Sequence, residues 1–129
     1  MNLFQVLYLV WEIKMNSDNI LTEYGLDALS AILHEIARDK GFWDGSTDYD
    51  KIGMKLALVH SEVTETLEAL RKSKGSEAVV EEIADIIIRI LDVYAALRNE
   101  EVVLHSLDDI LKNKINKNKE RPKLHGNKF

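Results

Sequence analysis

Apolar residues recur along most of the chain with the three- and four-residue spacing of amphipathic helices. Between residues 22 and 40 the recurring positions are Leu26, Leu29, Leu33 and Ile36. After a glycine-containing loop at residues 41–50, a second stripe consists of Ile52, Leu56, Val59, Val63, Leu67 and Leu70. We expect Asp50 to cap this second helix, because an aspartate oxygen accepts hydrogen bonds from the unpaired amides of a first turn.

Two further helices are predicted in the second half of the chain. The third runs from Glu77 to about Leu97 with Ser76 as its N-cap. It is apolar on most sides, so we expect it to be the most buried element. The fourth runs from about Val102 to Asn118, before a tail that contains the only proline. Four helices with short connections and no alternating strand pattern predict an all-α fold, a four-helix bundle.

Length and composition favour a single domain over residues 1–129. The chain has one proline and six glycines, which favours helices over a turn-rich β architecture. We divide the chain into an apolar leader at residues 1–15, a helical core at residues 20–118 and a basic C-terminal tail at residues 119–129. The leader is too short to span a membrane and lacks a signal-peptide pattern. Since the chain also has no cysteine, we expect a cytoplasmic protein without a membrane partner.

Charge is distributed unevenly along the chain. Residues 112–128 hold seven of the 17 basic residues and one of the 22 acidic residues, a net charge of +6, which leaves −11 for the rest. An acidic body suits a cation, and a basic tail suits phosphate groups, although a tail of this kind can also be simply solvated. Nucleic acid is not an expected partner, because the acidic body argues against a broad basic groove.

Two pairs of acidic residues border or enter the apolar faces of their helices. Glu62 and Glu65 lie one turn apart on the second predicted helix, and Glu82 and Asp85 have the same spacing on the third. A carboxylate on an interior face is strongly destabilising unless it is paired with a cation or bound to a metal. If these two helices are neighbours, four carboxylates converge and need a positive partner.

Three interpretations of these acids remain open. Single pairs at this spacing are usually exposed to solvent, whereas Arg89, Lys55 or Arg98 would neutralise the acids in a structural ion network. The third interpretation is a divalent cation, since four carboxylates repel one another. Oxygen ligands favour Mg²⁺, with Mn²⁺ as a substitute. A di-iron centre is not expected, because helical bundles that hold one use Glu-x-x-His pairs, and the acid pairs of this chain contain no histidine.

At these acids the chain resembles the MazG-like, all-α nucleoside triphosphate pyrophosphohydrolases. "EVTE" at Glu62–Glu65 and "EIAD" at Glu82–Asp85, separated by 16 residues, resemble the E-x-x-E…E-x-x-D signature of that family. Three longer blocks are similar to its small single-domain members: "KLALVHSEVTETLEALR", "EEIADIIIRILD" and "KINKNKERPKLHGNKF". The resemblance implies Mg²⁺-dependent hydrolysis of a nucleoside triphosphate between its α- and β-phosphates, giving the monophosphate and pyrophosphate.

The resemblance also implies roles for single residues. The metal ligands and catalytic residues would be Glu62, Glu65, Glu82 and Asp85, with Asp92 as a secondary candidate. The phosphate-binding residues would be Lys114, Asn118, Arg121 and Lys128. Members of the family form dimers or tetramers, so a homodimer or homotetramer is expected.

Other features leave the function partly open. Phe42 and Trp43 are candidates for stacking on a base, and an aromatic pair beside a glycine equally often anchors its loop on the core. A phosphoribosyl-ATP pyrophosphatase would share the fold and the arrangement of acids. A non-catalytic helical module, with the acids in an ion network and the tail bound to a polyanion or protein, is the alternative from a different class.

Overall fold

The computed structural model describes residues 25–45, 47–100 and 106–128 continuously. Near the N-terminus it also describes Asn2, Phe4, Gln5, Leu7, Tyr8 and Trp11. The elements with described bounds are α3 (Leu26–Asp39), α4 (Tyr49–Arg71), α5 (Ser76–Glu100), α6 (Leu107–Glu120) and the 3₁₀ helix η2 (Lys123–Gly126). None of the described residues lies in a strand, so the prediction of an all-α fold is confirmed. Most of the expected leader and the start of the fourth predicted helix near Val102 lie outside the described residues.

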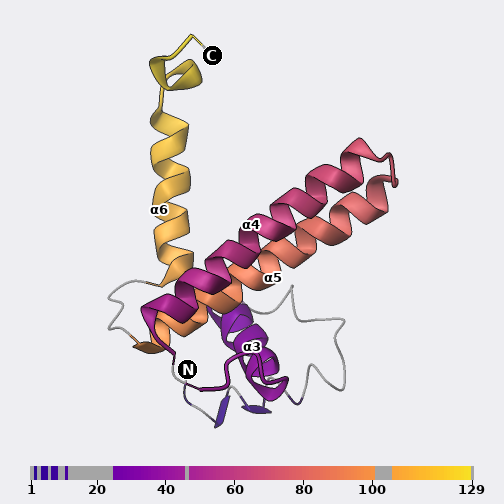
Figure 1. The fold of residues 1–129 in the computed structure, drawn as a ribbon. Coiled ribbons are helices and arrows are strands. Elements are labelled where there is room, and N and C mark those ends of the chain that lie inside the picture. The colour runs from indigo at the N-terminus through magenta and orange to yellow at the C-terminus, as the bar shows by residue number, and fades with distance from the viewer. Residues whose placement is uncertain are drawn as a thin grey trace.

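The helices α4 and α5 form a long antiparallel hairpin, and α3 packs against α5 near the open end of that hairpin (Figure 1). The helix α6 extends away from the hairpin and carries the C-terminus at its far end (Figure 1). Among the described elements, α6 packs mainly against α3. Within one chain, therefore, α6 does not line up with the hairpin as the fourth member of a closed bundle.

The helix starts differ slightly from the predicted ones. The N-cap of α4 is Asp48, whose side chain accepts a hydrogen bond from the backbone amide of Lys51, so the prediction of Asp50 as the cap is wrong by two residues. Asp50 instead lies in the first turn, where its negative charge interacts favourably with the positive end of the helix dipole. Ser76 is the first residue of α5 rather than its cap. Ser106 caps α6 by accepting from the amide of Asp109.

Two helix N-termini are joined by reciprocal caps. The carboxylate of Asp108 in α6 accepts hydrogen bonds from the amides of Leu26 and Asp27 at 2.9 and 3.2 Å. In return, the carboxylate of Asp27 in α3 accepts from the amide of Leu107 at 2.9 Å. Arg98 of α5 donates to the same Asp27 carboxylate at 2.7 Å. These bonds set the direction in which α6 leaves the body.

The apolar core is small, and most of it lies where α3, α5 and the start of α4 meet, with Ala69 buried separately near the end of α4. The buried apolar residues are Ile32, Trp43, Ile52, Ala69, Leu91, Val93, Ala95 and Ala96. Most of the predicted α4 stripe is exposed instead, with Leu56, Val63, Leu67 and Leu70 between 41% and 64% exposed. A matching stripe on α5 consists of Val80, Ile83, Ile87 and Ile90. The expectation that the third helix would be the most buried element holds only for its second half.

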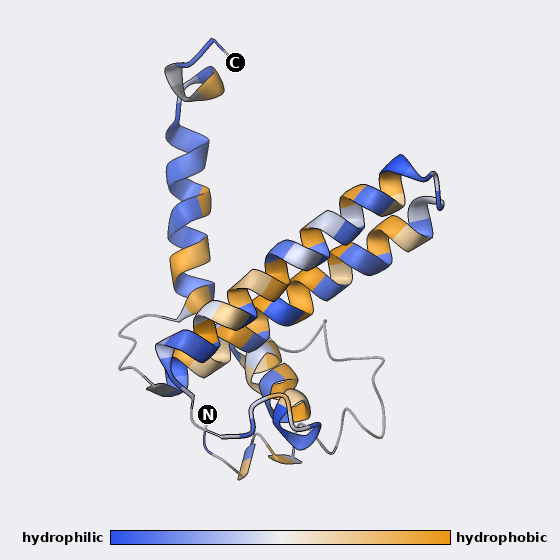
Figure 2. Ribbon diagram, viewed as in Figure 1, coloured by the Kyte–Doolittle hydropathy of each residue, from blue (hydrophilic) through white to orange (hydrophobic). Residues whose placement is uncertain are grey.

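Apolar positions continue along the whole hairpin, well beyond the part that α3 covers (Figure 2). None of the described helices is long and apolar enough to cross a membrane. The described part of the chain thus leaves apolar surface exposed along the hairpin.

Candidate functional site

Three carboxylates from the two helices of the hairpin converge. Glu62 of α4 and Glu82 and Asp85 of α5 each present an oxygen, and these oxygens lie within 4.8 Å of one another. The antiparallel packing sets the middle of α4 against the first half of α5, and the three-residue spacing puts Glu82 and Asp85 on one side of α5. Burial is graded across the group: Glu62 is buried, Glu82 is half-buried and Asp85 is exposed. We call these residues the acidic triad.

Glu62 already has a cationic partner within the chain. The Nε of Arg89 donates to its carboxylate at 2.5 Å, from a side chain that remains 41% exposed. This ion pair stabilises the buried charge of Glu62, as the structural-network interpretation requires. For Glu82 and Asp85, the described part of the chain supplies no such ion pair. A divalent cation at the acidic triad would therefore compete with Arg89 for one carboxylate and neutralise the other two.

Glu65, the fourth acid of the signature, does not join the acidic triad. Its side chain is exposed, and its carboxylate lies 3.5 Å from the hydroxyl of Ser61 on the outer side of α4. On a helix, residues three apart are separated by about 60° around the axis. That rotation is enough to leave Glu62 in the contact between α4 and α5 while Glu65 faces solvent.

Asp92 holds the loop after α3 against α5. Both of its carboxylate oxygens accept from the indole nitrogen of Trp43, at 2.9 and 3.0 Å, and one lies 2.7 Å from Nδ1 of His34. The loop reaches this position through a Schellman turn, in which Gly41 has a φ of +82° and Phe42 donates to the carbonyl of Ala37.

The two aromatic candidates have different surroundings. Trp43 is only 6% exposed, as expected for a loop anchor, whereas Phe42 is 61% exposed. Of the pair, Phe42 is the side chain that a ligand can reach in this structure. Trp43 therefore anchors its loop on α5 through Asp92, which was one of the two roles expected for the aromatic pair.

A cavity of about 240 Å³ lies between α3, α4 and α5 and borders the acidic triad. Its lining includes Ile36, Phe42, Lys55, Asp85, Arg89 and Asp92. Asp85 belongs both to the cavity and to the acidic triad. A larger cavity of about 600 Å³ lies beside the reciprocal caps and shares no residue with the acidic triad. The smaller cavity is therefore the one placed to receive a group bound next to the triad.

The sequence indicates Lys55 only as a possible ion-pair partner for the acids, and its place in this cavity is a finding of the structure. A signal was present: Lys55 stands three residues after Ile52 and four before Val59, on the side of the helix that becomes buried. A lysine at such a position is expected to interact with an anion or a ligand, because charged side chains are rarely this buried without a partner.

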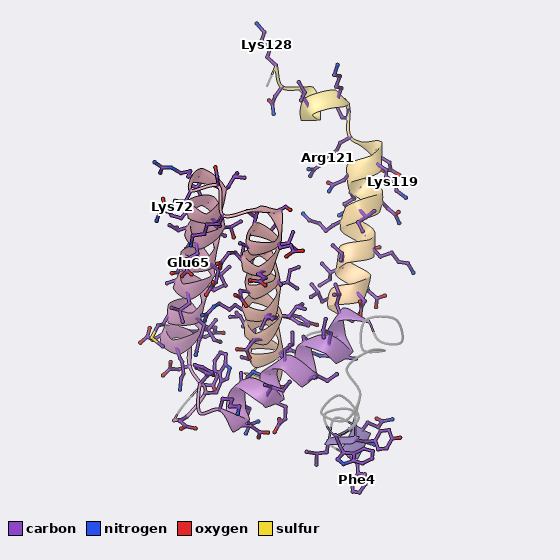
Figure 3. All side chains as sticks on the ribbon, turned by 90° about the vertical axis from the view of Figure 1, so that its right-hand side faces the viewer. Phe4, Glu65, Lys72, Lys119, Arg121 and Lys128 are labelled. Carbon is purple, nitrogen blue, oxygen red and sulfur yellow. The ribbon has the colours of Figure 1, made fainter. Side chains whose placement is uncertain are left out.

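The four phosphate-binding candidates lie elsewhere. Lys114 and Asn118 are exposed on α6, Arg121 is the C-cap of that helix, and Lys128 follows η2. Figure 3 shows Arg121 and Lys128 on the α6 side of the molecule, apart from the helix that carries Glu65. In a single chain these residues do not meet the acidic triad.

Comparison with known proteins identifies no relative: the chain matches no family model, no curated protein and no solved structure. The features that bear on function are therefore the acidic triad, the adjoining cavity and the spacing of the acidic residues.

Proposed function

We propose that the protein is a Mg²⁺-dependent nucleoside triphosphate pyrophosphohydrolase that cleaves between the α- and β-phosphates of a (d)NTP. The observation that carries the proposal is the convergence of Glu62, Glu82 and Asp85, which offer oxygen atoms of the kind that Mg²⁺ and Mn²⁺ prefer. The resemblance of the acid spacing to the MazG-like signature supports this choice over other metal-dependent reactions.

The residues of the site have complementary roles in this reaction. A Mg²⁺ ion held by the acidic triad would neutralise phosphate oxygens and lower the pKa of a bound water. Water attacks the α-phosphorus, the bond from that phosphorus to the bridging oxygen breaks, and pyrophosphate leaves while the water loses a proton. The exposed carboxylate of Asp85 lies at the solvent side of the acidic triad, where substrate and water arrive. The buried carboxylate of Glu62 provides a fixed ligand deeper in the hairpin.

We further propose that the active protein is a homodimer or homotetramer assembled through the exposed stripes of α4 and α5. Burying apolar side chains is the main favourable contribution to stable association. Assembly also provides a route by which α6 of one copy approaches the acidic triad of another, since within one chain α6 leads away from it (Figure 1). In that arrangement Lys114, Asn118, Arg121 and Lys128 bind the β- and γ-phosphates.

One observation favours the non-catalytic alternative. The ion pair between Glu62 and Arg89 is what a structural ion network would contain. This alternative predicts that Mg²⁺ does not bind at the acidic triad.

The deciding experiment incubates the full-length protein with a panel of (d)NTPs and Mg²⁺ and separates the products. We expect the monophosphate and pyrophosphate in equal amounts. Release of inorganic phosphate without pyrophosphate would overturn the cleavage position. Phosphoribosyl-ATP belongs in the panel, since its exclusive turnover would identify the related pyrophosphatase instead.

A further inference from the structure

Lys55 is a buried cation that forms no salt bridge with the described residues. Its side chain is only 9% exposed, and its Nζ lies 5.1 Å from the ring centre of Trp43 and 5.3 Å from that of Phe42. The two aromatic rings partly offset its charge through cation–π contacts. Burial lowers the pKa of Lys55; Asp92 opposes that shift, and the cations Lys51 and Arg89 add to it.

The charge of Lys55 faces the 240 Å³ cavity beside the acidic triad. Lys40 and Arg89 line the same cavity, together with two carboxylates, Asp85 and Asp92. Asp92 is already occupied by hydrogen bonds from Trp43 and His34. Asp85 is committed to the acidic triad. The lining nevertheless holds three cations against these two carboxylates, so its formal net charge is positive.

The walls of the cavity strengthen that positive field. They include the apolar side chains of Leu33, Ile36, Ile88 and Val93. Apolar walls exclude water, and a charge–charge contact is stronger where the surroundings are less polarisable. An anion that entered the cavity would gain direct hydrogen bonds from charged donors, which are about twice as strong as neutral ones.

We propose that this cavity is a binding site for a phosphate oxyanion, held by Lys55 and Arg89 next to the acidic triad. The ammonium group of Lys55 donates to one phosphate oxygen, and the guanidinium group of Arg89 donates to another. A divalent cation at the acidic triad frees Arg89 from Glu62 for this contact. The identity of the ligand as a nucleotide phosphate rests on the proposed function, whereas the binding of the anion does not.

Fluorescence of Trp43 reports on the cavity directly. The chain has two tryptophans, so a Trp11→Phe background leaves Trp43 as the single emitter, 5.1 Å from the Lys55 ammonium. Titration of the full-length protein with pyrophosphate, with and without Mg²⁺, should give a saturable change in emission. Lys55→Met should weaken pyrophosphate binding by about tenfold or more, because it removes a charged hydrogen-bond donor.

Two variants distinguish the contact from a general effect of charge. Lys55→Arg keeps a cation in the cavity and should retain most of the affinity. Lys72→Met removes a lysine at the exposed end of the same helix, where it pairs with Glu68 at 3.0 Å, and should leave affinity unchanged. Equal loss of affinity in Lys55→Met and Lys72→Met would overturn the proposal.

A measurement on the unsubstituted protein is independent of whether Lys55→Met folds. Limited acetylation followed by peptide mass spectrometry gives the modification rate of each lysine. Pyrophosphate should slow acetylation of Lys55 several-fold and leave Lys72 unaffected. Absence of protection, together with an unchanged Trp43 emission, would overturn the proposal.

Different results would overturn the phosphate site and the proposed function. An uncharged nucleoside that perturbs Trp43 while pyrophosphate does not would show that the cavity takes a base, and the phosphate site would be wrong. Pyrophosphate binding that depends on Lys55, in a protein that hydrolyses no nucleotide, would support the site and overturn the proposed function. Normal hydrolysis in Lys55→Met would support the proposed function and overturn the phosphate site at Lys55.

Discussion

Neighbouring acids on one helix have different surroundings in this protein. Glu62 is buried and bound to Arg89, Glu65 is exposed beside Ser61, and Glu68 forms surface ion pairs with Arg71 and Lys72. Only the first contributes to the acidic triad. Surface pairs of the kind that Glu68 makes contribute little to stability. Single substitutions along α4 can therefore separate a functional carboxylate from ordinary ones.

Glu62→Gln and Asp85→Asn should each reduce nucleotide turnover by about 100-fold or more, since loss of even an indirect support of a metal ligand typically costs 10- to 100-fold. The helical circular dichroism should persist, because both substitutions preserve shape. Glu68→Gln is the matched control and should retain activity. Full activity in both triad variants would show that the metal site is misassigned.

Glu65→Gln in the same assay tests the fourth acid of the signature. Its exposed position predicts a smaller loss than that of Asp85→Asn. A loss of equal size would mean that four carboxylates, rather than the three that converge here, hold the metal.

Mg²⁺ should raise the melting temperature of the protein. A ligand at 100 times its Kd adds about 2.7 kcal/mol to the free energy of unfolding, which corresponds to several degrees for a chain of this length. Differential scanning fluorimetry in millimolar Mg²⁺, with EDTA as the reference, measures the effect. Asp85→Asn should abolish it, and a melting temperature unmoved by Mg²⁺ in the unsubstituted chain would favour the non-catalytic module.

The pH dependence of stability should reveal the burial of Lys55. Because the pKa of Lys55 is lower in the folded chain, the unfolded chain binds more protons between that value and the ordinary 10.5. The free energy of unfolding therefore rises with pH through this window. Urea unfolding in phosphate-free buffer should show the unsubstituted chain gaining stability relative to Lys55→Met as pH approaches 10.5. Parallel pH profiles for the two proteins would contradict a lowered pKa.

At the level of helices, the reciprocal caps decide where α6 points. Asp27 and Asp108 each satisfy backbone amides at the start of the other's helix, and Arg98 connects Asp27 to α5. The first amides of a helix have no partner within it, so an aspartate from elsewhere both stabilises and positions the helix. The basic residues of α6 thus extend from a defined anchor rather than from a free tail.

Asp108→Ala should lower the free energy of unfolding by about 1–2 kcal/mol, the usual cost of removing a capping side chain. Urea unfolding monitored by circular dichroism measures it. Asp109→Ala is the matched control, since Asp109 is the next residue, is exposed and receives its cap from Ser106. Equal losses in the two variants would show that helix charge, rather than the cap, is responsible.

For the whole molecule, the dominant feature is the apolar surface that the described residues leave exposed on the hairpin. The stripes of α4 and α5 expose eight large apolar side chains between 39% and 64%. Contiguous apolar patches of this kind mark interaction sites in soluble proteins. Self-association covers such a surface without requiring a second protein.

Leu67→Glu should shift the protein toward the monomer, because it places a charge within the proposed interface. Size-exclusion chromatography with light scattering measures the mass. Ser61→Glu adds the same charge on the opposite side of α4 and should leave the assembly unchanged. A monomeric unsubstituted protein at micromolar concentration would overturn the proposed oligomer.

Much of the architecture follows from the sequence alone. The three- and four-residue apolar spacing determined that the described chain is helical, and the segments around Leu33, Val63 and Ile87 are helices as predicted. Spacing along one helix correctly placed Glu82 beside Asp85, but it also placed Glu65 beside Glu62, and Glu65 does not join the acidic triad.

Only the tertiary structure decided which side of each helix is covered. Periodicity identifies a face but not the partner against which it packs, so Leu56 and Val63 were expected inside and are exposed, while Lys55 is buried. The pairing of Glu62 with Arg89, 27 residues later, and the direction of α6 depend on contacts between separate elements. Such contacts form when the helices dock, and no local pattern in the chain encodes them individually.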